Sequence, residues 1–376
     1  MPTPVERRRL AEVYRKPPMT DLFAPLAFAR GPAMKNRFML APLTNLQSHA
    51  DGTLSDDEFH WLTLRARGGF GLTMTCASHV QARGQGFPGQ LGCWSDAYVA
   101  GLTRLAAAIR AAGSLAFVQL HHAGMRSPQE LTGTQPVCPS EDAETGSRAL
   151  TLTEVEQLRD DFIAAAARAE RAGFDGVELH GAHGYVLSQF LSGTLNRRTD
   201  RYGGSLENRS RLVFEIVTGI RARCRLDFTL GIRISPERFG LELGEMRDFA
   251  QRLLSDGRLD FVDLSLWDVF KEPNEDAFKS RPLIDWFTDL ERGATRLGVA
   301  GKIMDGATAR KCLAHGADFV TIGRAAILHH DFPERVRADP DFTPVALPVS
   351  AEHLRAQGLG PAFVGYMKTW KGFVAD

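Results

Sequence analysis

The chain lacks several features that mark whole classes of proteins. Its five cysteines are an odd number without a C-x-x-C pair, which argues against a disulfide framework, a structural zinc site or an iron–sulfur cluster and fits a reducing compartment. Lys plus Arg equals Asp plus Glu at 45 each, so the basic excess of proteins that bind nucleic acid or membrane surfaces is missing. No apolar run approaches the ~18 residues that span a bilayer. We therefore expect a soluble, cytoplasmic protein without a nucleic-acid or membrane partner.

The N-terminal segment also lacks the apolar stretch of a secretory signal. Its basic residues, Arg7 to Arg9 with Arg15 and Lys16, are not followed by such a stretch. The whole chain has 376 residues, of which 44% are hydrophobic and 24% charged. This composition favours a large folded core over disorder, and the length suits either one large α/β barrel or two ordinary domains.

What the chain does contain is a regular alternation of short apolar runs with amphipathic segments. Each run is nearly continuous in apolar residues, which is typical of strands buried on both faces of a parallel sheet. Capping boxes at Ser55–Glu58 and Thr153–Glu156, and N-caps at Ser205 and Asp305, predict helix starts between the runs. The predicted strands are Arg37–Ala41, Leu72–Ala77, Leu115–Leu120, Gly176–His180, Thr229–Ile234, Phe261–Ser265, Lys302–Met304 and Phe319–Gly323.

Eight β-then-α units in one chain predict an α/β protein built on a single closed (β/α)8 TIM barrel, rather than an open doubly wound sheet. A barrel of ~250 residues leaves roughly a third of the chain for extensions. We place the barrel core at about residues 36–332, with extensions before Asn36, in the loop Met125–Leu152 and in the tail 333–376. No Gly/Ser-rich linker divides the chain, so we expect a single domain over residues 1–376.

Polar side chains gather at the predicted C-terminal ends of the strands, where TIM-barrel enzymes carry their catalytic groups. The segment Glu178–Arg209 is the most informative, because His180, His183 and Tyr185 follow directly on a buried strand. These three hydrogen-bonding side chains are predicted to face one pocket. The other strand-end candidates are Thr44, Ala77, Gln119, Arg233, Gly306, Gly323 and Arg324.

The last two strand ends indicate a phosphorylated ligand. The loops after strands seven and eight of TIM barrels commonly hold a phosphate. Gly306 and Gly323 allow close approach of the backbone, and Arg324 can donate paired hydrogen bonds to phosphate oxygens.

Other interpretations of the same residues stay open from the sequence. His180 and His183 could be structural or could form a metal pair, although no third ligand stands out and we expect no metal. Tyr185 could cap the barrel, and Arg233 could belong to a structural ion pair. The arginine-rich run after Asn196 is interpreted as a loop and a helix start that are held by salt bridges and caps.

Five ordered motifs run through the chain: NRFMLAPLTN at Asn36–Asn45, FVQLHHAG at Phe117–Gly124, the block Glu178–Arg209, GIRIS at Gly231–Ser235 and ADFVTIGRAAI at Ala317–Ile327. They resemble those of the Old Yellow Enzyme family of FMN-dependent oxidoreductases, from about Leu22 to Phe332. In three positions the chain departs from patterns that are frequent in that family. His183 stands where many members have Asn, Asn45 stands where part of the family has Arg, and Met125 replaces the arginine of the HAGR run.

The resemblance implies roles for the residues around a flavin. Thr44 would hydrogen-bond flavin O4 near N5, and the backbone of Ala77 would contact the same edge. Gln119 would pair with the pyrimidine edge, and Arg233 would lie beside N1 and O2, where its charge stabilises the reduced flavin. The residues that would hold the FMN phosphate are Gly306, Gly323 and Arg324.

The resemblance also implies a reaction. NAD(P)H would reduce the flavin, and an electron-poor alkene or a nitro compound would accept the hydride. His180 and His183 would donate hydrogen bonds to the substrate oxygen, and Tyr185 would protonate the α-carbon. A homo-oligomer is compatible with this interpretation of the sequence.

Three alternative functions remain at this point. The barrel could use flavin on another small substrate, in an oxidative demethylation or a degradative redox step. It could bind flavin without turnover. It could also be a sugar-phosphate lyase or isomerase without flavin, for which Lys302 on predicted strand seven is the best-placed lysine for a Schiff base.

Overall fold

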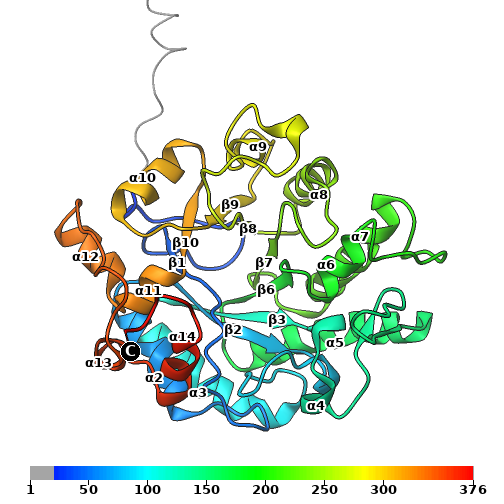
Figure 1. The fold of residues 1–376 in the computed structure, drawn as a ribbon, viewed down its shortest axis with the longest axis horizontal. Helices are drawn as coiled ribbons and strands as arrows, with labels where there is room; N and C mark the ends of the chain where they lie inside the picture. The colour runs from blue at the N-terminus through cyan, green and yellow to red at the C-terminus, as the bar shows by residue number, and fades with distance from the viewer. Residues whose placement is uncertain (1–20, 376) are drawn as a thin grey trace, which may run out of the picture.

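The computed structural model describes residues 21–375. Its parallel strands close into one barrel in the order β1-β10-β9-β8-β7-β6-β3-β2, seen nearly end-on in Figure 1. The (β/α)8 barrel predicted from the sequence is confirmed. The barrel strands are β1 (Phe38–Leu40), β2 (Leu72–His79), β3 (Leu115–His121), β6 (Gly176–Gly181), β7 (Thr229–Ile234), β8 (Phe261–Ser265), β9 (Arg296–Ala300) and β10 (Phe319–Ile322).

Helices surround the strands on the outside of the barrel (Figure 1). Each long return helix buries one stripe; in α5, Val155, Leu158 and Phe162 are fully buried at helical spacing. The longer helices are α2 (Asp56–Arg67), α3 (Val99–Ala111), α5 (Leu152–Arg171), α7 (Leu206–Arg223), α8 (Leu243–Ser255) and α10 (Gly306–Ala314).

One predicted strand is wrong. The seventh strand is Arg296–Ala300, which pairs with both β8 and β10, whereas Lys302–Met304 follows it as a loop. The sequence Leu-Gly-Val-Ala is as short and apolar as Lys-Ile-Met, and length and hydrophobicity do not separate the two. The sequence therefore predicts the loop after this strand at residues that lie too late in the chain.

The predicted helix starts are mostly confirmed. One capping box is displaced by two residues, because the side chain of Thr151, not Thr153, accepts the backbone N–H of Glu154, whose carboxylate completes the box. Ser55 caps α2 through the N–H of Glu58, but the Glu58 carboxylate accepts a hydrogen bond from Asn45 instead of closing a box. The other two confirmed N-caps are Ser205 and Asp305.

The barrel interior is apolar at the end where the strands begin. Phe117, Phe261 and Phe319 pack there, and the N-terminal segment adds Leu26 and Phe28 to the same cluster. Because inward positions alternate along a strand, the next inward residues are polar and face the opposite end of the barrel. Each of these three rings packs over a glycine of the adjacent strand, where a Cβ atom would overlap the ring: Gly176, Gly231 and Gly298.

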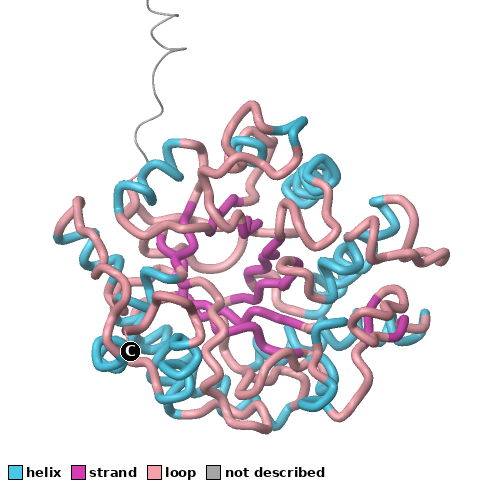
Figure 2. Tube along the Cα trace, in the orientation of Figure 1, coloured by secondary structure: helices cyan, strands magenta, loops and turns pink. Residues whose placement is uncertain are grey.

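The loop after β3 and the C-terminal helices lie outside the ring of strands (Figure 1). The loop after β3 contains a small ladder of β4 (Val137–Cys138) and β5 (Arg148–Ala149), which Figure 2 shows at the periphery. Phe363 of the C-terminal helix α14 packs edge-on against Trp61 of α2, with ring centres 4.8 Å apart. The short helices are α4 (Gln129–Thr132), α6 (Val186–Leu191), α9 (Asp285–Thr288), α11 (Arg324–Leu328), α12 (Phe332–Ala338), α13 (Ala351–Ala356) and α14 (Pro361–Lys368).

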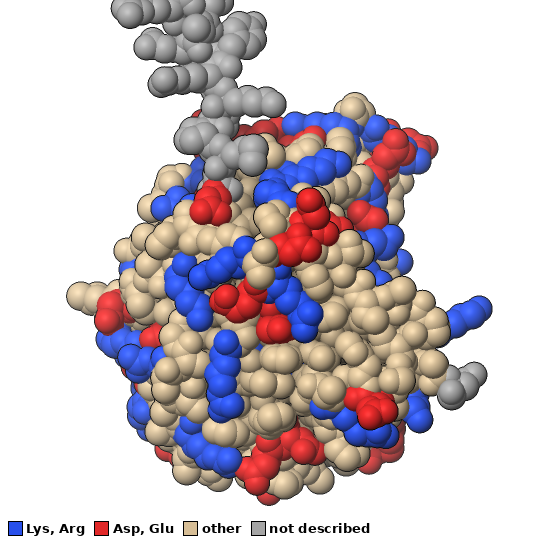
Figure 3. All heavy atoms as spheres, turned by 90° about the vertical axis from the view of Figure 1, so that its left-hand side faces the viewer, with Lys and Arg blue, Asp and Glu red and all other residues tan. Residues whose placement is uncertain are grey.

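Several expectations from composition can be compared with the structure. All five cysteines are buried and unpaired. On the face shown in Figure 3, lysine and arginine side chains lie among acidic ones. Among residues 21–375, no helix combines the length and the apolar character that crossing a bilayer requires. The prediction about a secretory signal concerns residues that lie outside the described part of the chain.

Candidate active site

Two adjoining cavities open at the C-terminal ends of the barrel strands. The outer cavity has a volume of about 620 Å³ and the inner one about 180 Å³. They share Pro42, Leu43, His183 and Trp370 as lining residues. Nine of the ten predicted site residues line one or both: Thr44, Ala77, Gln119, His180, His183 and Tyr185 the inner cavity, and His183, Arg233, Gly323 and Arg324 the outer one.

Gly306 is the predicted site residue that the structure does not bring to the cavities. It is the first residue of α10, and a Cβ atom there would face Val336 and Pro340 instead. The glycine that lines the outer cavity after β9 is Gly301. Its φ of 152° is rare for other residues, and a Cβ would meet the backbone of Asp268. Gly301 was missed because the strand before it was placed too late.

His180 presents a neutral N–H donor to the inner cavity. Its Nδ1 accepts the backbone N–H of Ala182 at 3.3 Å, so the proton of the neutral ring is on Nε2. Burial, followed by the neighbouring His183 and His121, holds the pKa of His180 well below its usual value. The ring is therefore uncharged at neutral pH and can donate without carrying a formal charge.

His183 stands in a backbone conformation that is rare for a residue other than glycine, with φ of 61°. Its backbone N–H donates to Ser235 Oγ at 2.9 Å, and its Nε2 lies 2.7 Å from Ser265 Oγ. These contacts hold the ring over the barrel mouth, where it meets His180 with ring centres 5.1 Å apart. Burial and the charge of Arg233 lower the pKa of His183 to about 3, so this ring is also neutral.

Tyr185 completes the group at the start of α6, where it is the N-cap residue. Its ring packs against His180 and His121, with centres 5.0 and 4.4 Å away. Burial raises the pKa of the phenol above its usual value, so the hydroxyl keeps its proton at neutral pH. The side chain lines the inner cavity.

Arg126 is a site residue that sequence reasoning missed. Its guanidinium carbon lies 4.8 Å from the centre of the Tyr185 ring, and its Nη1 donates to the carbonyl oxygen of His183 at 2.6 Å. In the sequence, Met125 occupies the arginine position of the HAGR run, and Arg126 follows it outside that motif. A cation over the ring favours the ionised phenol and lowers the Tyr185 pKa against the effect of burial.

The floor of the cavities is a buried polar layer inside the barrel. Gln119 Nε2 donates to Glu178 Oε1 at 2.7 Å. Arg233 Nε lies 3.4 Å from Asp263 Oδ2, and Thr321 Oγ1 donates to Asp263 Oδ1 at 3.0 Å. Arg233 thus has the structural ion pair that was weighed as an alternative and lines the outer cavity as well. The two acids were missed, although a carboxylate within an apolar strand is itself a signal.

The outer cavity is lined by a cationic side chain. Arg324 lines the cavity, and within residues 21–375 its side chain forms no ion pair and no hydrogen bond. The adjacent Gly323 is the N-cap residue of α11, whose first backbone N–H groups lack partners inside the helix. A free guanidinium beside unpaired amides fits a phosphate dianion, and the FMN implied by the resemblance carries one.

Lys302 does not fit the Schiff-base role that the lyase alternative needs. It lies in the loop after β9 at the rim of the outer cavity, and its Nζ pairs with Asp268 Oδ2 at 3.0 Å. An ammonium held by a carboxylate is not a free amine nucleophile.

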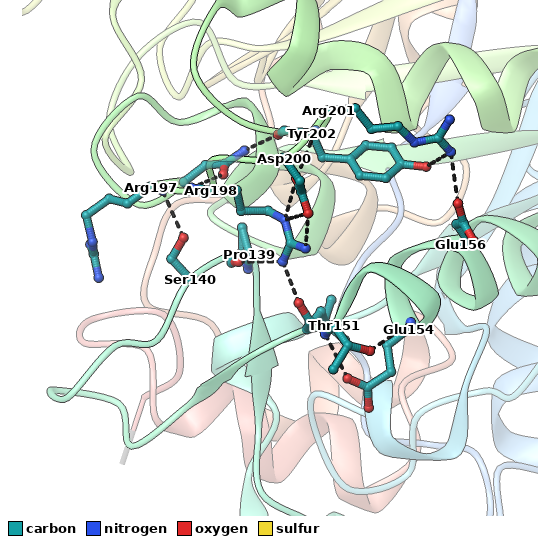
Figure 4. A network of polar contacts seen from close by, with 12 residues as sticks. Pro139, Ser140, Thr151, Glu154, Glu156, Arg197, Arg198, Asp200, Arg201 and Tyr202 are labelled. Atoms are coloured by element: carbon teal, nitrogen blue, oxygen red, sulfur yellow. Dashed lines mark hydrogen bonds and ion pairs between the residues drawn. The ribbon is translucent and has the colours of Figure 1, made fainter.

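The arginine-rich run is scaffolding, as expected. Arg198 forms an ion pair with Asp200 at 2.6 Å and donates to the carbonyl oxygens of Pro139 and Leu150. Figure 4 shows that this side chain joins the loop before α7 to the segment that leads into α5. The run therefore fixes the loop that follows α6 and lies outside the cavity walls.

Known proteins are similar to this chain over most of its length. A model of the NADH:flavin oxidoreductase / NADH oxidase family matches residues 21–340. The probable NADH-dependent flavin oxidoreductase YqiG of Bacillus subtilis (strain 168) is 35% identical over 332 residues, which cover 85% of this chain and 89% of that protein.

Solved structures of Old Yellow Enzyme relatives are also similar to this chain. The Old Yellow Enzyme homologue of Zymomonas mobilis has a TM-score of 0.75 at 28% identity and covers 92% of this chain and 99% of its own. Morphinone reductase in complex with tetrahydroNAD has a TM-score of 0.75 at 29% identity, covering 92% and 96%. These matches set aside the lyase alternative. The chain belongs to the NADH:flavin oxidoreductase / NADH oxidase family, that of the Old Yellow Enzyme, and is an FMN-dependent NAD(P)H oxidoreductase.

Proposed function

We propose that this protein reduces activated C=C bonds of α,β-unsaturated carbonyl or nitro compounds. The observation that carries the proposal is the convergence of two neutral imidazoles and one protonated phenol on the inner cavity. Neutral N–H donors suit a carbonyl or nitro oxygen whose negative charge grows during the reaction. A metal or a charged acid is not required for that task.

The side chains divide the work in this proposal. Bound FMN would supply the redox chemistry, the passage of a hydride from NAD(P)H to the acceptor. His180 Nε2–H and the His183 ring hold the acceptor oxygen and draw electron density from its β-carbon. Tyr185 then gives its hydroxyl proton to the α-carbon, for which it must lie within hydrogen-bond reach.

The cofactor contacts are part of the same proposal. Thr44, Ala77 and Gln119 would meet the flavin ring from the inner cavity, and Arg233 would meet it from the outer cavity. Gly323 and Arg324 would hold the phosphate. For the loop after β9 we propose Gly301 in place of Gly306, because Gly301 lines the outer cavity and Gly306 does not.

The test is anaerobic. Protein loaded with FMN is reduced with NADH or NADPH and then mixed with enones, enals, maleimides and nitro-olefins. Rapid reoxidation by such alkenes supports the proposal, whereas reoxidation by oxygen alone contradicts it.

A double variant separates the substrate site from the cofactor site. His180→Ala with His183→Ala should keep FMN but lose the absorption change that phenols cause when they bind over the flavin. His60→Ala, an exposed residue of α2, is the matched control. Unchanged phenol binding in the double variant would rule out the assigned role of the histidines.

A further inference from the structure

The polar floor of the barrel contains two carboxyl groups but one guanidinium. Glu178 on β6 and Asp263 on β8 are both fully buried. The groups that face Glu178 are Gln119 from β3, Arg233 from β7 and Asp263 from β8. Only one of these carries a positive charge, and that guanidinium is paired with Asp263.

Two carboxylate oxygens in this layer have no hydrogen-bond donor within the described residues. They are Oε2 of Glu178 and Oδ2 of Asp263. Two ionised carboxylates in a dry interior with one guanidinium are unfavourable, whereas one bound proton makes the layer neutral. Gln119 donates to Oε1 of Glu178, which leaves Oε2 as the atom for that proton.

We propose that Glu178 is a positioning residue that carries a titratable proton below the flavin, so that the reduction potential of the bound FMN depends on the protonation of Glu178. With Glu178 protonated, Arg233 and Asp263 cancel and the layer is neutral. With Glu178 ionised, the layer carries one negative charge directly below the cavity. That charge opposes the negative charge that a reduced flavin acquires.

The chemistry balances without a further reactant. A hydride from NAD(P)H brings two electrons and one proton to the flavin. At a pH between the pKa of Glu178 beside oxidised flavin and its higher pKa beside reduced flavin, a second proton moves from solvent to Glu178 Oε2 when the flavin is reduced, and no other bond changes. Burial, followed by the charge of Asp263, raises the pKa of Glu178 well above its usual value, and burial also raises the pKa of Asp263.

Glu178 has a second effect through Gln119. Because the Nε2 group of that amide is bonded to Glu178 at 2.7 Å, its Oε1 remains to accept a hydrogen bond from the cofactor. The floor therefore fixes which end of the Gln119 amide meets the flavin.

The experiment measures the midpoint potential of the FMN-loaded protein from about pH 6 to about pH 10, with redox dyes and without any alkene. In the wild type the slope of potential against pH should steepen, by at most about 30 mV per pH unit, over the pH range in which Glu178 is ionised beside oxidised flavin and protonated beside reduced flavin, as expected for one proton per two electrons. Glu178→Gln keeps the acceptor for Gln119 but cannot ionise, so the steepening should vanish. Glu237→Gln removes a buried carboxylate that pairs with Lys271 outside the layer, and it should retain the steepening.

A second variant tests the coupling. Asp263→Asn removes the charge that disfavours ionised Glu178, so the break should move to lower pH. The proposal is overturned if the wild type shows no change of slope, or if Glu178→Gln keeps the break. Since no alkene is present, these outcomes are independent of whether the protein reduces C=C bonds.

Discussion

The guanidinium of Arg126 lies over the ring of Tyr185, 4.8 Å from its centre, and donates to the carbonyl oxygen of His183 at 2.6 Å. One side chain thus joins the proposed proton donor to the left-handed backbone of a proposed substrate ligand. The positive charge stabilises the phenolate that remains after proton transfer.

The substitution Arg126→Met should therefore make Tyr185 a weaker acid. We expect its pKa to rise further and the proton-dependent step to slow by about 2- to 10-fold, in line with the energy of a cation over an aromatic ring. The tyrosinate signal in ultraviolet difference titrations reports the pKa, and Tyr185→Phe identifies which part of the signal belongs to this residue. Arg126→Lys keeps the charge and should recover part of the rate. Identical titrations for the Arg126→Met variant and the wild type would refute the relationship.

Substitutions of Arg324 and Gly306 should have different effects on cofactor binding. Arg324→Gln should weaken FMN by about 10- to 100-fold, because hydrogen bonds from a charged group to a phosphate contribute about 1.5–3 kcal/mol. Gly306→Ala should leave the FMN dissociation constant unchanged. It should instead lower the unfolding free energy by about 1 kcal/mol or more, since the added Cβ would lie 2.7 Å from Val336 Cγ1. Fluorescence titration with FMN and urea unfolding measure the two effects, and weaker FMN binding in the alanine variant would restore Gly306 to the phosphate site.

The sequence predicted the barrel because strands that are buried on both faces leave short apolar runs, and seven of the eight runs coincide with strands. The prediction of the seventh strand is wrong. In the actual strand an inward glycine, Gly298, packs beside Phe319, and a second apolar run follows within two residues of the strand end. Propensity carries no information about which run pairs with its neighbours. That pairing depends on the register of β8 and β10.

The sequence predicts the site residues that belong to one local motif. It does not predict contacts between residues that only the fold brings together. Tyr185 and both histidines follow one strand, so their proximity is local. Arg126 reaches Tyr185 from the loop after another strand, β3, and the charge of Asp263 acts on Glu178 from β8, which is separated from β6 by β7. A buried acid in an apolar strand can be noticed from the sequence, but its partner cannot be named without the closed barrel.

The C-terminal tail should take part in binding the acceptor. Tyr366 and Met367 line the inner cavity, and Trp370 lines both cavities. Trp370→Ala opens this wall and should raise the KM for an apolar enone by about 10-fold, the effect of losing roughly 1.5 kcal/mol of apolar contact. Trp94→Ala, at a surface tryptophan that is 38% exposed and packs on Tyr98, is the control. Steady-state kinetics with both variants decide, and an equal KM for the two would place the tail outside the acceptor site.

The neutral state of His183 should make the fold sensitive to acid. Its pKa falls from an ordinary 6.5 to about 3 in the folded protein, so the unfolded chain binds a proton between these values and the folded protein does not. The unfolding free energy then rises with pH over this window and is lost as the pH falls from about 6.5 toward 3. His183→Asn removes this titration while keeping a side chain that can donate a hydrogen bond. Between about pH 7 and about pH 5 the variant should lose less stability than the wild type, by on the order of 1 kcal/mol. Urea unfolding of the two proteins at each pH measures the difference, and parallel losses would mean that His183 is charged in the folded state.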